Sequence, residues 1–375
     1  MNSGIFKIFG FNILFELDDS IESSILMEEL GCYPKSSSQD HDLIIQYEVK
    51  GAIADDELSS NPSSHTLYCD GFSMKTNNIT ARFIFDSSNL NKVIFSYNRG
   101  SGFIFKTVQK WSHIQFRHER EAIGQIVHEF ILVPINFFLS NRAIIHASAV
   151  ITQPGKLLMF GGTGGVGKTS LELELCRNHG CSFFADDICV ADDSGNVFPN
   201  LSYPKIYGYN LINNDALRRE LIRGYNLSDR VHWKLHSFRG LDKVRRRVSP
   251  FTIYKKVTRQ AHLINGFFIL NRTNVNLLEV KEIDNDFSSR LNTEVIKAEY
   301  QIVFQHLFWH RYNTLINKSE AITTFDDTMN KNIDVLSNCL NRSGGKSYLI
   351  NIPMHLSNIE LKEQISSELK KLALL

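Results

Sequence analysis

The sequence predicts an α/β protein with a phosphate-binding loop and a β-rich N-terminal region. Two observations lead to this prediction. An apolar run at 157–160 is followed at 162–169 by a complete G-x-x-x-x-G-K-[ST] motif and then by a helical pattern. Residues 1 to about 110 contain several short runs in which apolar and polar side chains alternate, as in half-buried strands. We therefore expect a β-rich N-terminal domain over 1–115 and a phosphate-loop domain over 116–375.

Composition restricts the classes of partner. The 375 residues contain 41 Lys and Arg against 40 Asp and Glu, a net charge of +1, so the overall charge favours neither nucleic acid nor an acidic membrane. The six cysteines form no C-x-x-C pair, which favours a reducing, cytoplasmic location. No apolar stretch reaches membrane-spanning length. We expect no nucleic-acid or membrane partner, and the sequence leaves open whether the chain forms a homo-oligomer.

The N-terminal region reads as strands separated by turns. Alternating runs occur at 11–15, 44–49, 81–85 and 93–97. The apolar N-terminus at 5–15 lacks a charged start and a small-residue cleavage site, so a β-hairpin or strand is favoured over a signal peptide. This region carries no nucleotide or metal signature.

A helix is predicted over 119–140, with Pro134 expected to kink or divide it. A buried strand over 143–151 follows and carries His146 in an apolar run. A histidine in such a run is usually a core residue. His146, however, lies one short hairpin before the phosphate-loop strand, so a functional role and a core role are both kept open.

The phosphate loop is the strongest functional signal. A strand, a glycine turn and a helix start together aim backbone N–H groups and the positive end of a helix dipole at one point. The Lys168 ammonium is placed to contact the β- and γ-phosphates of a nucleotide, and the Thr169 hydroxyl is a natural Mg²⁺ ligand. The predicted nucleotide-binding residues of the loop are Gly162, Thr163, Gly164, Gly165, Val166, Gly167, Lys168, Thr169 and Ser170.

A second apolar strand, predicted over 181–190, carries the pair Asp186 and Asp187. In open α/β sheets ligands bind beyond the carboxyl ends of strands. A carboxylate there can hold Mg²⁺, and a second one can take the proton of an attacking hydroxyl. The alternative is that the pair only caps a turn.

Three features in order, His146 with Ala-Ser-Ala-Val, the phosphate loop, and Ala185 with the Asp pair, resemble the catalytic domain of the HPr kinase/phosphorylase superfamily. The similarity is strongest to stand-alone HPr kinase-like members, including those of lasso-type ribosomal-peptide biosynthesis, and covers about residues 120–205. It implies a P-loop kinase domain of the HPr-kinase/PEP-carboxykinase-like type that uses ATP and Mg²⁺.

The sequence also departs from that superfamily. The bifunctional HPr enzymes carry a Glu-Ile-Arg-Gly segment where this chain has Tyr203-Pro-Lys-Ile-Tyr-Gly-Tyr, so their acidic Mg²⁺ ligand is missing. The resemblance therefore does not extend to phosphorolysis or to HPr as the substrate. Lys205 falls where stand-alone members often have a basic residue, and we include it among the nucleotide-binding residues.

The C-terminal third completes the predicted domain. Residues 211–260 are rich in Lys and Arg, and we expect a solvated, mobile loop, especially from Lys234 to Arg247, that could close over nucleotide or bind an acidic peptide. A strand at 261–270, helices over 285–345, a closing strand at 346–353 and a terminal helix at 358–375 follow. The aromatic residues of the 285–345 helices are predicted to be core: Phe304, Phe308, Trp309 and Tyr312.

The predicted activity is transfer of the γ-phosphoryl group of ATP to a hydroxyl, favoured to be a serine of a peptide or protein. Lys168 neutralises phosphate charge, Thr169 and Asp187 hold Mg²⁺, Asp186 is the base, and His146 supports the reaction site. Two other functions are open: a nucleotide-gated binding protein with little turnover, and a kinase of a small molecule such as free serine.

Overall fold

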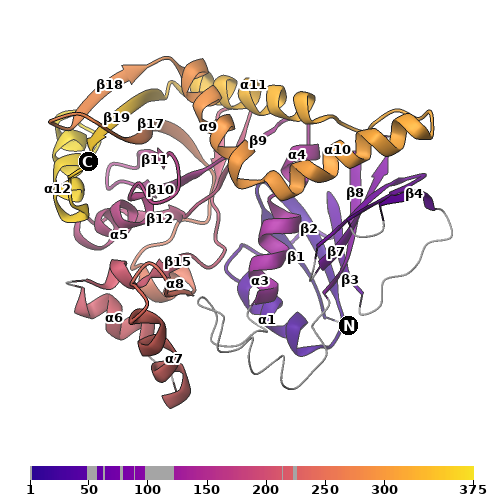
Figure 1. The fold of residues 1–375 in the computed structure, drawn as a ribbon, viewed down its shortest axis with the longest axis horizontal. Helices are drawn as coiled ribbons and strands as arrows, with labels where there is room; N and C mark the ends of the chain where they lie inside the picture. The colour runs from indigo at the N-terminus through magenta and orange to yellow at the C-terminus, as the bar shows by residue number, and fades with distance from the viewer. Residues whose placement is uncertain are drawn as a thin grey trace.

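The computed structural model describes residues 2–48, 57–61, 64–76, 79–87, 89–97, 122–212, 214–222 and 226–375. It is a mixed α/β fold built on two large sheets (Figure 1). Residues 119–121 of the predicted helix and Arg223 of the basic segment lie outside the described residues. The first sheet comes from the N-terminal region and the second contains the phosphate-loop strand.

The N-terminal sheet has eight described strands in the order β1-β2-β3-β8-β7-β6-β5-β4. Their bounds are β1 Asn2–Ile8, β2 Phe11–Leu17, β3 Leu43–Tyr47, β4 Glu57–Asn61, β5 His65–Tyr68, β6 Gly71–Lys75, β7 Ile79–Asp86 and β8 Asn89–Tyr97. β1 and β2 form an antiparallel hairpin, so this prediction is confirmed. Buried and less buried side chains alternate along β7, because one face of the sheet packs on a core.

Short helical segments join the two sheets. Helix α1 (Ile21–Leu30) packs beside α3 (Ala122–Val127), which continues through a π-helical turn, η2 (His128–Leu132), into α4 (Ile135–Phe138). Pro134 caps α4, so the predicted helix is divided where proline cannot donate a backbone hydrogen bond.

The second sheet has nine described strands, with the path β12-β10-β11-β17-β14-β13-β9 and with β19 pairing both β17 and β18. Their bounds are β9 Arg142–Ile145, β10 Ala147–Ile151, β11 Leu157–Gly161, β12 Ser182–Ala185, β13 Cys189–Asp192, β14 Asn196–Phe198, β17 His262–Thr273, β18 Glu279–Ile283 and β19 Lys346–Pro353. β11, β17 and β19 run parallel at its centre. As predicted, the strand at 261–270 joins the sheet of the phosphate loop.

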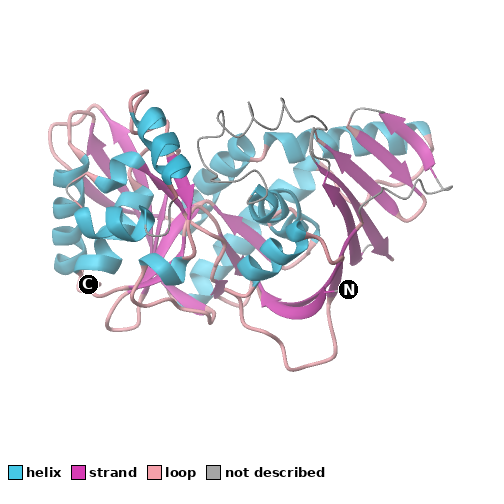
Figure 2. Ribbon diagram, turned by 90° about the horizontal axis from the view of Figure 1, so that it is seen from below, coloured by secondary structure: helices cyan, strands magenta, loops and turns pink. Residues whose placement is uncertain are grey.

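Helices cover this sheet and also reach the first one (Figure 2). Helix α5 (Lys168–Asn178) and α12 (Asn358–Lys371) pack together, and α9 (Asn285–Glu299) packs on α11 (Phe325–Ser343). Helix α10 (Gln301–Ile316) instead packs on β4, β5 and β6 of the N-terminal sheet. One cluster of buried apolar side chains therefore includes residues of both sheets.

The prediction of an aromatic core in 285–345 is wrong for three of its four residues. Phe304 is buried, but Phe308, Trp309 and Tyr312 are 56%, 40% and 53% exposed. The physical reason is that α10 packs with one face on the N-terminal sheet and on α9 and α11, and only the face carrying Phe304 meets the core.

The basic segment is also more ordered than predicted. It forms helix α6 (Asp215–Ile222), helix α7 (Leu227–Ser237), a short helix α8 (Pro250–Ile253), and a two-stranded ribbon of β15 (Lys205–Tyr207) with β16 (Arg245–Arg247). Four of its apolar side chains, Leu217, Leu221, Trp233 and Val244, are buried and fix it in place, whereas others at the two ends of α7, such as Leu227 and Phe238, are exposed. The predicted loop from Lys234 to Arg247 is therefore the end of a helix, a turn and a strand.

Two further observations concern the whole described chain. None of its helices combines the length and the apolar character needed to cross a membrane. All six cysteines lie among the described residues and are free thiols, five of them buried.

Candidate active site

Two neighbouring chain segments of the second sheet are each interrupted, and the residues at the two interruptions line the candidate site. The sequence predicted continuous strands over 143–151 and 181–190. The structure instead divides the first into β9 and β10 at His146, and the second into β12 and β13 at Asp186 and Asp187. β10 pairs with β12 while β9 pairs with β13, so both chain segments cross between the two halves of the sheet together. Asp187 has a φ of 64°, which turns the backbone at the crossing.

The phosphate loop joins β11 to α5 as predicted. Gly162 has a φ of 124°, and a Cβ there would lie 2.4 Å from the Leu270 carbonyl oxygen, so the loop requires glycine at this position. Helix α5 begins at Lys168, which places its first N–H groups at the loop. Lys168 is 6% exposed, and its Nζ donates to the carbonyl oxygens of Gly162 and Thr163, each at 2.8 Å.

The remaining loop residues line or support the same hollow. Thr163, Gly164 and Gly165 are exposed, whereas Val166 is buried under the loop. The Ser170 hydroxyl accepts a hydrogen bond from Asn210 Nδ2 at 2.9 Å, so the first turn of α5 is tied to the segment after β15.

Asp186 is joined to the phosphate loop. Its Oδ1 accepts hydrogen bonds from Thr169 Oγ1 at 2.9 Å and from Ser148 Oγ at 3.0 Å. Burial, and then the charge of Asp187, raise the pKa of Asp186 to about 6 although both hydroxyls favour its ionised form. Ser148, on β10, was not identified from the sequence.

Asp187 contacts a cation. Its Oδ2 lies 3.5 Å from Lys205 Nζ, which also donates to Glu129 Oε1 at 2.8 Å. Burial raises the pKa of Asp187, but the charges of Lys205, His146 and Lys168 outweigh it, so its pKa lies below the ordinary value. Burial lowers the pKa of Lys205, but Glu129 and Asp187 together raise it above the usual value. Asp187 is therefore ionised at neutral pH.

His146 stands between the loop and the Asp pair. Its backbone N–H donates to Asn292 Oδ1 at 2.9 Å, and its Nδ1 lies 3.1 Å from the Gly162 carbonyl oxygen. A carbonyl can only accept, so Nδ1 carries the proton and Nε2 has the lone pair. Burial, and then the charge of Lys168, lower the pKa of His146, which keeps the ring neutral at pH 7.

Two cavities meet at these residues. The first, of about 210 Å³, is lined by the phosphate loop. The second, of about 300 Å³, extends towards η2 and α10. The residues that line both are His146, Asp186, Asp187, Lys205, Arg245 and Glu299. The structure thus brings together the four predicted residues His146, Asp186, Asp187 and Lys205. It adds Arg245, from the segment that was expected to be able to close over nucleotide, and Glu299, which nothing in the sequence indicated.

A third cavity continues from the phosphate-loop hollow. It measures about 1050 Å³ and shares Ser170 and Tyr209 with the first cavity. Its walls come from α5, from residues 209–212, 214–220 and 251–255, and from the start of α12. The loop hollow therefore opens on one side to a small charged cavity and on another to a larger one.

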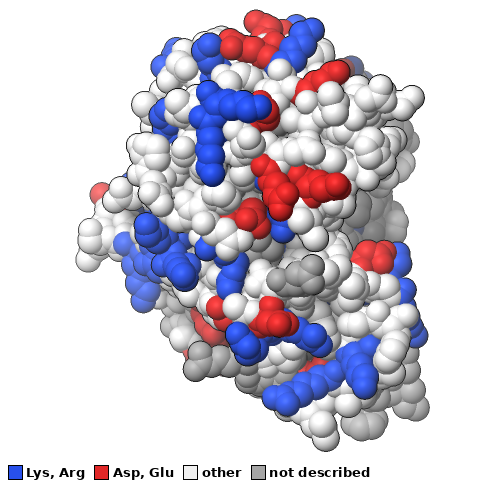
Figure 3. All heavy atoms as spheres, turned by 90° about the vertical axis from the view of Figure 1, so that its left-hand side faces the viewer, with Lys and Arg blue, Asp and Glu red and all other residues white. Residues whose placement is uncertain are grey.

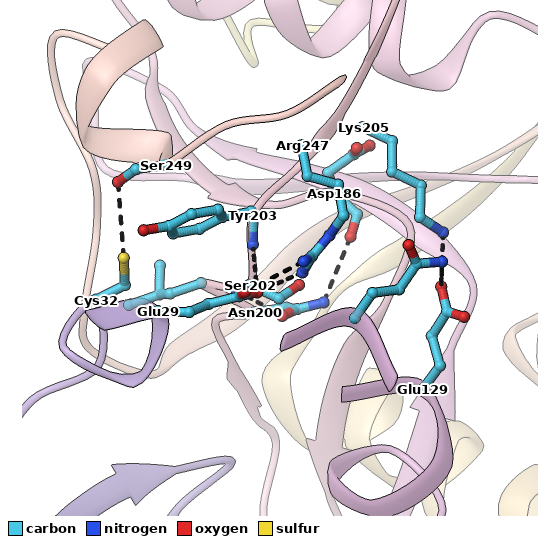
Figure 4. A network of polar contacts seen from close by, with 12 residues as sticks. Glu29, Cys32, Glu129, Asp186, Asn200, Ser202, Tyr203, Lys205, Arg247 and Ser249 are labelled. Carbon is cyan, nitrogen blue, oxygen red and sulfur yellow. Dashed lines mark hydrogen bonds and ion pairs between the residues drawn. The ribbon is translucent and has the colours of Figure 1, made fainter. Parts of the chain in front are cut away.

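A polar network connects the site to the N-terminal region (Figure 4). Glu29 of α1 pairs with Arg247 of β16 and accepts the backbone N–H of Tyr203 at 3.2 Å. Asn200 Nδ2 donates to the Asp186 carbonyl oxygen at 3.4 Å. Residues that line the second cavity are thus held by an ion pair and a hydrogen bond to α1, which lies more than a hundred residues earlier in the chain.

The described residues contain no group of three or more His, Cys, Asp or Glu side chains that could hold a metal ion. The oxygen atoms of Thr169 and Asp186 lie 2.9 Å apart beside the loop. A pair of hard oxygen ligands of this kind suits Mg²⁺ held jointly by protein and phosphate.

The sequence matches no known family model, and no curated protein matches it. Among solved structures, one match is the structure of the Hpr(Ser) kinase/phosphatase from Coxiella burnetii, with 14% sequence identity and a TM-score of 0.24. The match covers 61% of this chain and 98% of that chain. At this level of similarity, the function has to be inferred from the geometry of the site itself.

Proposed function

We propose that this protein is an ATP- and Mg²⁺-dependent kinase that transfers the γ-phosphoryl group to a hydroxyl, which we expect to be a serine of a peptide or protein. The observation that carries the proposal is the meeting of two cavities at Asp187. One cavity is lined by the phosphate loop, and the other offers room for an acceptor. A phosphoryl transfer needs such a shared boundary, because the attacking oxygen must reach the phosphorus atom in line with the leaving group.

The donor half of the site fits a nucleotide. The N–H groups at the start of α5 and the Lys168 ammonium suit the phosphates. The third cavity begins beside the same turn of α5 and is large enough for a ribose and a base. We propose that it holds the adenosine part of ATP, with Ser170 and Tyr209 at its entrance.

The hydrogen bond between Thr169 and Asp186 supports an exchange of the roles expected from the sequence. We propose that Asp186, rather than Asp187, is the carboxylate on the metal side, together with the Thr169 hydroxyl. Bound Mg²⁺ would supply positive charge to the β- and γ-phosphates at this position.

Asp187 is then the group that takes the proton. It is ionised, it faces the second cavity, and Lys205 holds its carboxylate in place at 3.5 Å. In the proposed step the acceptor oxygen forms a bond to the γ-phosphorus while the bond to the ADP oxygen breaks. The acceptor proton passes to an Asp187 oxygen, and Nε2 of His146 is available as a hydrogen-bond acceptor beside it.

The second cavity also supports an alternative acceptor. It is small, about 300 Å³, and is lined by side chains of both signs, including Glu129, Glu299, Lys205 and Arg245. Such a cavity suits the ammonium and carboxylate groups of a free amino acid, so a kinase of free serine is the second candidate. A serine on a flexible peptide would place only its side chain and adjacent backbone there.

The test is transfer of ³²P from γ-labelled ATP in the presence of Mg²⁺. Free serine, a pool of serine-containing peptides, and no acceptor are compared, with the Asp187→Asn variant run in parallel. The proposal expects acceptor-dependent labelling by the parent protein and its loss in the variant, with Mg·ATP affinity kept within a few-fold. ATP binding without labelling of any acceptor would favour a nucleotide-gated binding protein.

A further inference from the structure

Helices α6 and α7 form a groove away from the reaction site, which we call the basic groove. It measures about 840 Å³ and does not contain any residue of the phosphate loop. It is lined by Gly208, Leu211, Ile212, Arg218, Arg219, Ile222, Arg230, Trp233, Lys234, Ser237 and Leu241. The proposed kinase reaction gives it no role.

The groove carries positive charge that the described protein does not neutralise. Arg218 and Arg219 on α6 and Arg230 and Lys234 on α7 are all exposed. No described side chain forms an ion pair with any of the four. Residues 205–247 contain eleven Lys and Arg against four Asp and Glu, although the whole chain has a net charge of only +1. Figure 3 shows Lys and Arg side chains gathered on the lower half of the face that includes these helices.

Apolar surface lies among these cations. Trp233 lines the groove but is only 8% exposed, and the Arg246 guanidinium lies 5.2 Å from its ring centre. Ile212 and Leu241 at the rim are 55% and 39% exposed. The surface therefore combines apolar contact area with four unneutralised cations, and a partner must satisfy both.

We propose that the basic groove binds an acidic segment of a polypeptide that also carries apolar side chains. Carboxylates of the segment would pair with the cations on α6 and α7, and an apolar side chain would contact Ile212 and Leu241. The groove is concave, so it suits an extended peptide lying between two helices. A lipid surface is flat, and proteins bind it with the outward apolar face of a basic helix. The phosphates of a nucleic acid would use the cations but not the apolar rim, so the combination of the two favours a peptide.

The groove is connected to the reaction site by a short path. The β15–β16 ribbon carries Lys205 and Arg245 at the cavities, and the chain continues from β15 directly into η3 (Gly208–Leu211), which lines the groove. The Gly208 N–H donates to the Val244 carbonyl at 2.9 Å, which keeps the ribbon and the groove together. Binding at the groove does not depend on the kinase proposal, and it can be measured without nucleotide.

The test uses a fluorescein-labelled 14-residue peptide with six Glu and three Leu, measured by fluorescence anisotropy with the full chain. The expected result is saturable binding that weakens with added salt. The affinity for the peptide should fall roughly tenfold in the Arg230→Glu/Lys234→Glu variant, because two exposed attractive contacts become repulsive. The matched control is Arg311→Glu/Lys370→Glu, which changes the net charge equally at exposed positions outside the segment that lines the groove and should bind as the parent does.

Three results would overturn the proposal: equal binding by parent and groove variant, equal binding of the same peptide with Gln in place of Glu, or no peptide binding alongside tight binding to phosphatidylserine vesicles or duplex DNA. If the charge reversals impair folding by circular dichroism, Arg230→Gln/Lys234→Gln replaces them with a smaller expected loss. The peptide titration contains no nucleotide, so a failed kinase assay does not affect this test.

Discussion

The Glu29 carboxylate and the Arg247 guanidinium form an ion pair whose side chains are only 7% and 5% exposed. Glu29 belongs to a helix of the N-terminal region, and Arg247 to the ribbon that borders both reaction cavities. A Cβ on Gly124 would lie 1.8 Å from Glu29 Oε2, so α3 approaches this pair as closely as glycine allows. The pair therefore joins three segments that are distant in sequence.

Removing one member of this ion pair should lower the stability of the fold. In Glu29→Gln the Arg247 charge stays buried without its counter-ion, and we expect a loss of about 3–5 kcal/mol in the free energy of unfolding. Urea denaturation followed by circular dichroism measures it. Glu28→Gln, an exposed neighbour on the same helix, should change stability by less than about 0.5 kcal/mol. A similar loss in both variants would contradict the importance of the pair.

Nucleotide binding should depend on Lys168. Its Nζ contacts two loop carbonyls beside the phosphate hollow, so Lys168→Ala removes a buried cation at the proposed phosphate position. A charge-assisted contact of this kind is worth about 1.5–3 kcal/mol, or roughly ten- to 150-fold in affinity. Calorimetric titration with Mg·ATP is the measurement, and Lys156→Ala, on the turn before β11, is the control. Unchanged affinity in Lys168→Ala would remove the phosphate-loop assignment.

The two aspartates should separate metal binding from proton transfer. Asp186→Asn keeps a partner for the Thr169 hydroxyl but removes the charge, so we expect ATP binding to lose most of its dependence on Mg²⁺. Asp187→Asn should retain that dependence and lose transfer by about 10²–10⁴-fold, the usual contribution of a positioned base. Calorimetry across Mg²⁺ concentrations and the labelling assay distinguish the two. The opposite pattern would restore the assignment expected from the sequence.

Acid should destabilise the interface between α10 and the N-terminal sheet. Burial lowers the pKa of His65 to about 3, with a smaller effect of the neighbouring His310 and His306. Burial lowers the pKa of His306 and of His310 to about 4. Above pH 6.5 these rings are neutral in both the folded and the unfolded chain. Between pH 6.5 and about 4 only the unfolded chain binds the protons, so stability falls as pH falls, by about 1.4 kcal/mol per ring and pH unit.

The His65→Phe variant tests this contribution. Neither ring nitrogen of His65 has a hydrogen-bond partner among the described residues, and the ring stacks on Phe72. Phenylalanine therefore loses no hydrogen bond and keeps an aromatic ring against Phe72. Urea midpoints of parent and variant between pH 7.5 and 4.5 should diverge below pH 6.5, with a shallower decline in the variant. Parallel curves would show that His65 takes up a proton in the folded state.

The sequence predicted the phosphate loop and its flanking elements because the required residues are adjacent in the chain. It did not predict the breaks at His146 and at Asp187. His146 lies in an apolar run, and the Asp pair has apolar residues on both sides. Both strands break where the sheet divides into two halves, which is a tertiary effect.

The cavity residues Glu129, Arg245 and Glu299 come from three distant segments, so local pattern could not group them. The basic segment was misjudged for a different reason. Its charge density indicated a loop, but Leu217 and Leu221 lie four residues apart and anchor one face of α6.

The packing of α10 and α4 has a practical consequence for producing parts of this protein. Phe138 of α4 lies 5.5 Å from Phe72 and 5.4 Å from Phe83, measured between ring centres, and Asn313 of α10 bonds to Asn61. A fragment that starts near residue 116 would lose the strands that cover these side chains and expose an aromatic surface to water. We expect such a fragment to aggregate on expression, so a truncation chosen at the predicted domain boundary would not yield an isolated catalytic unit.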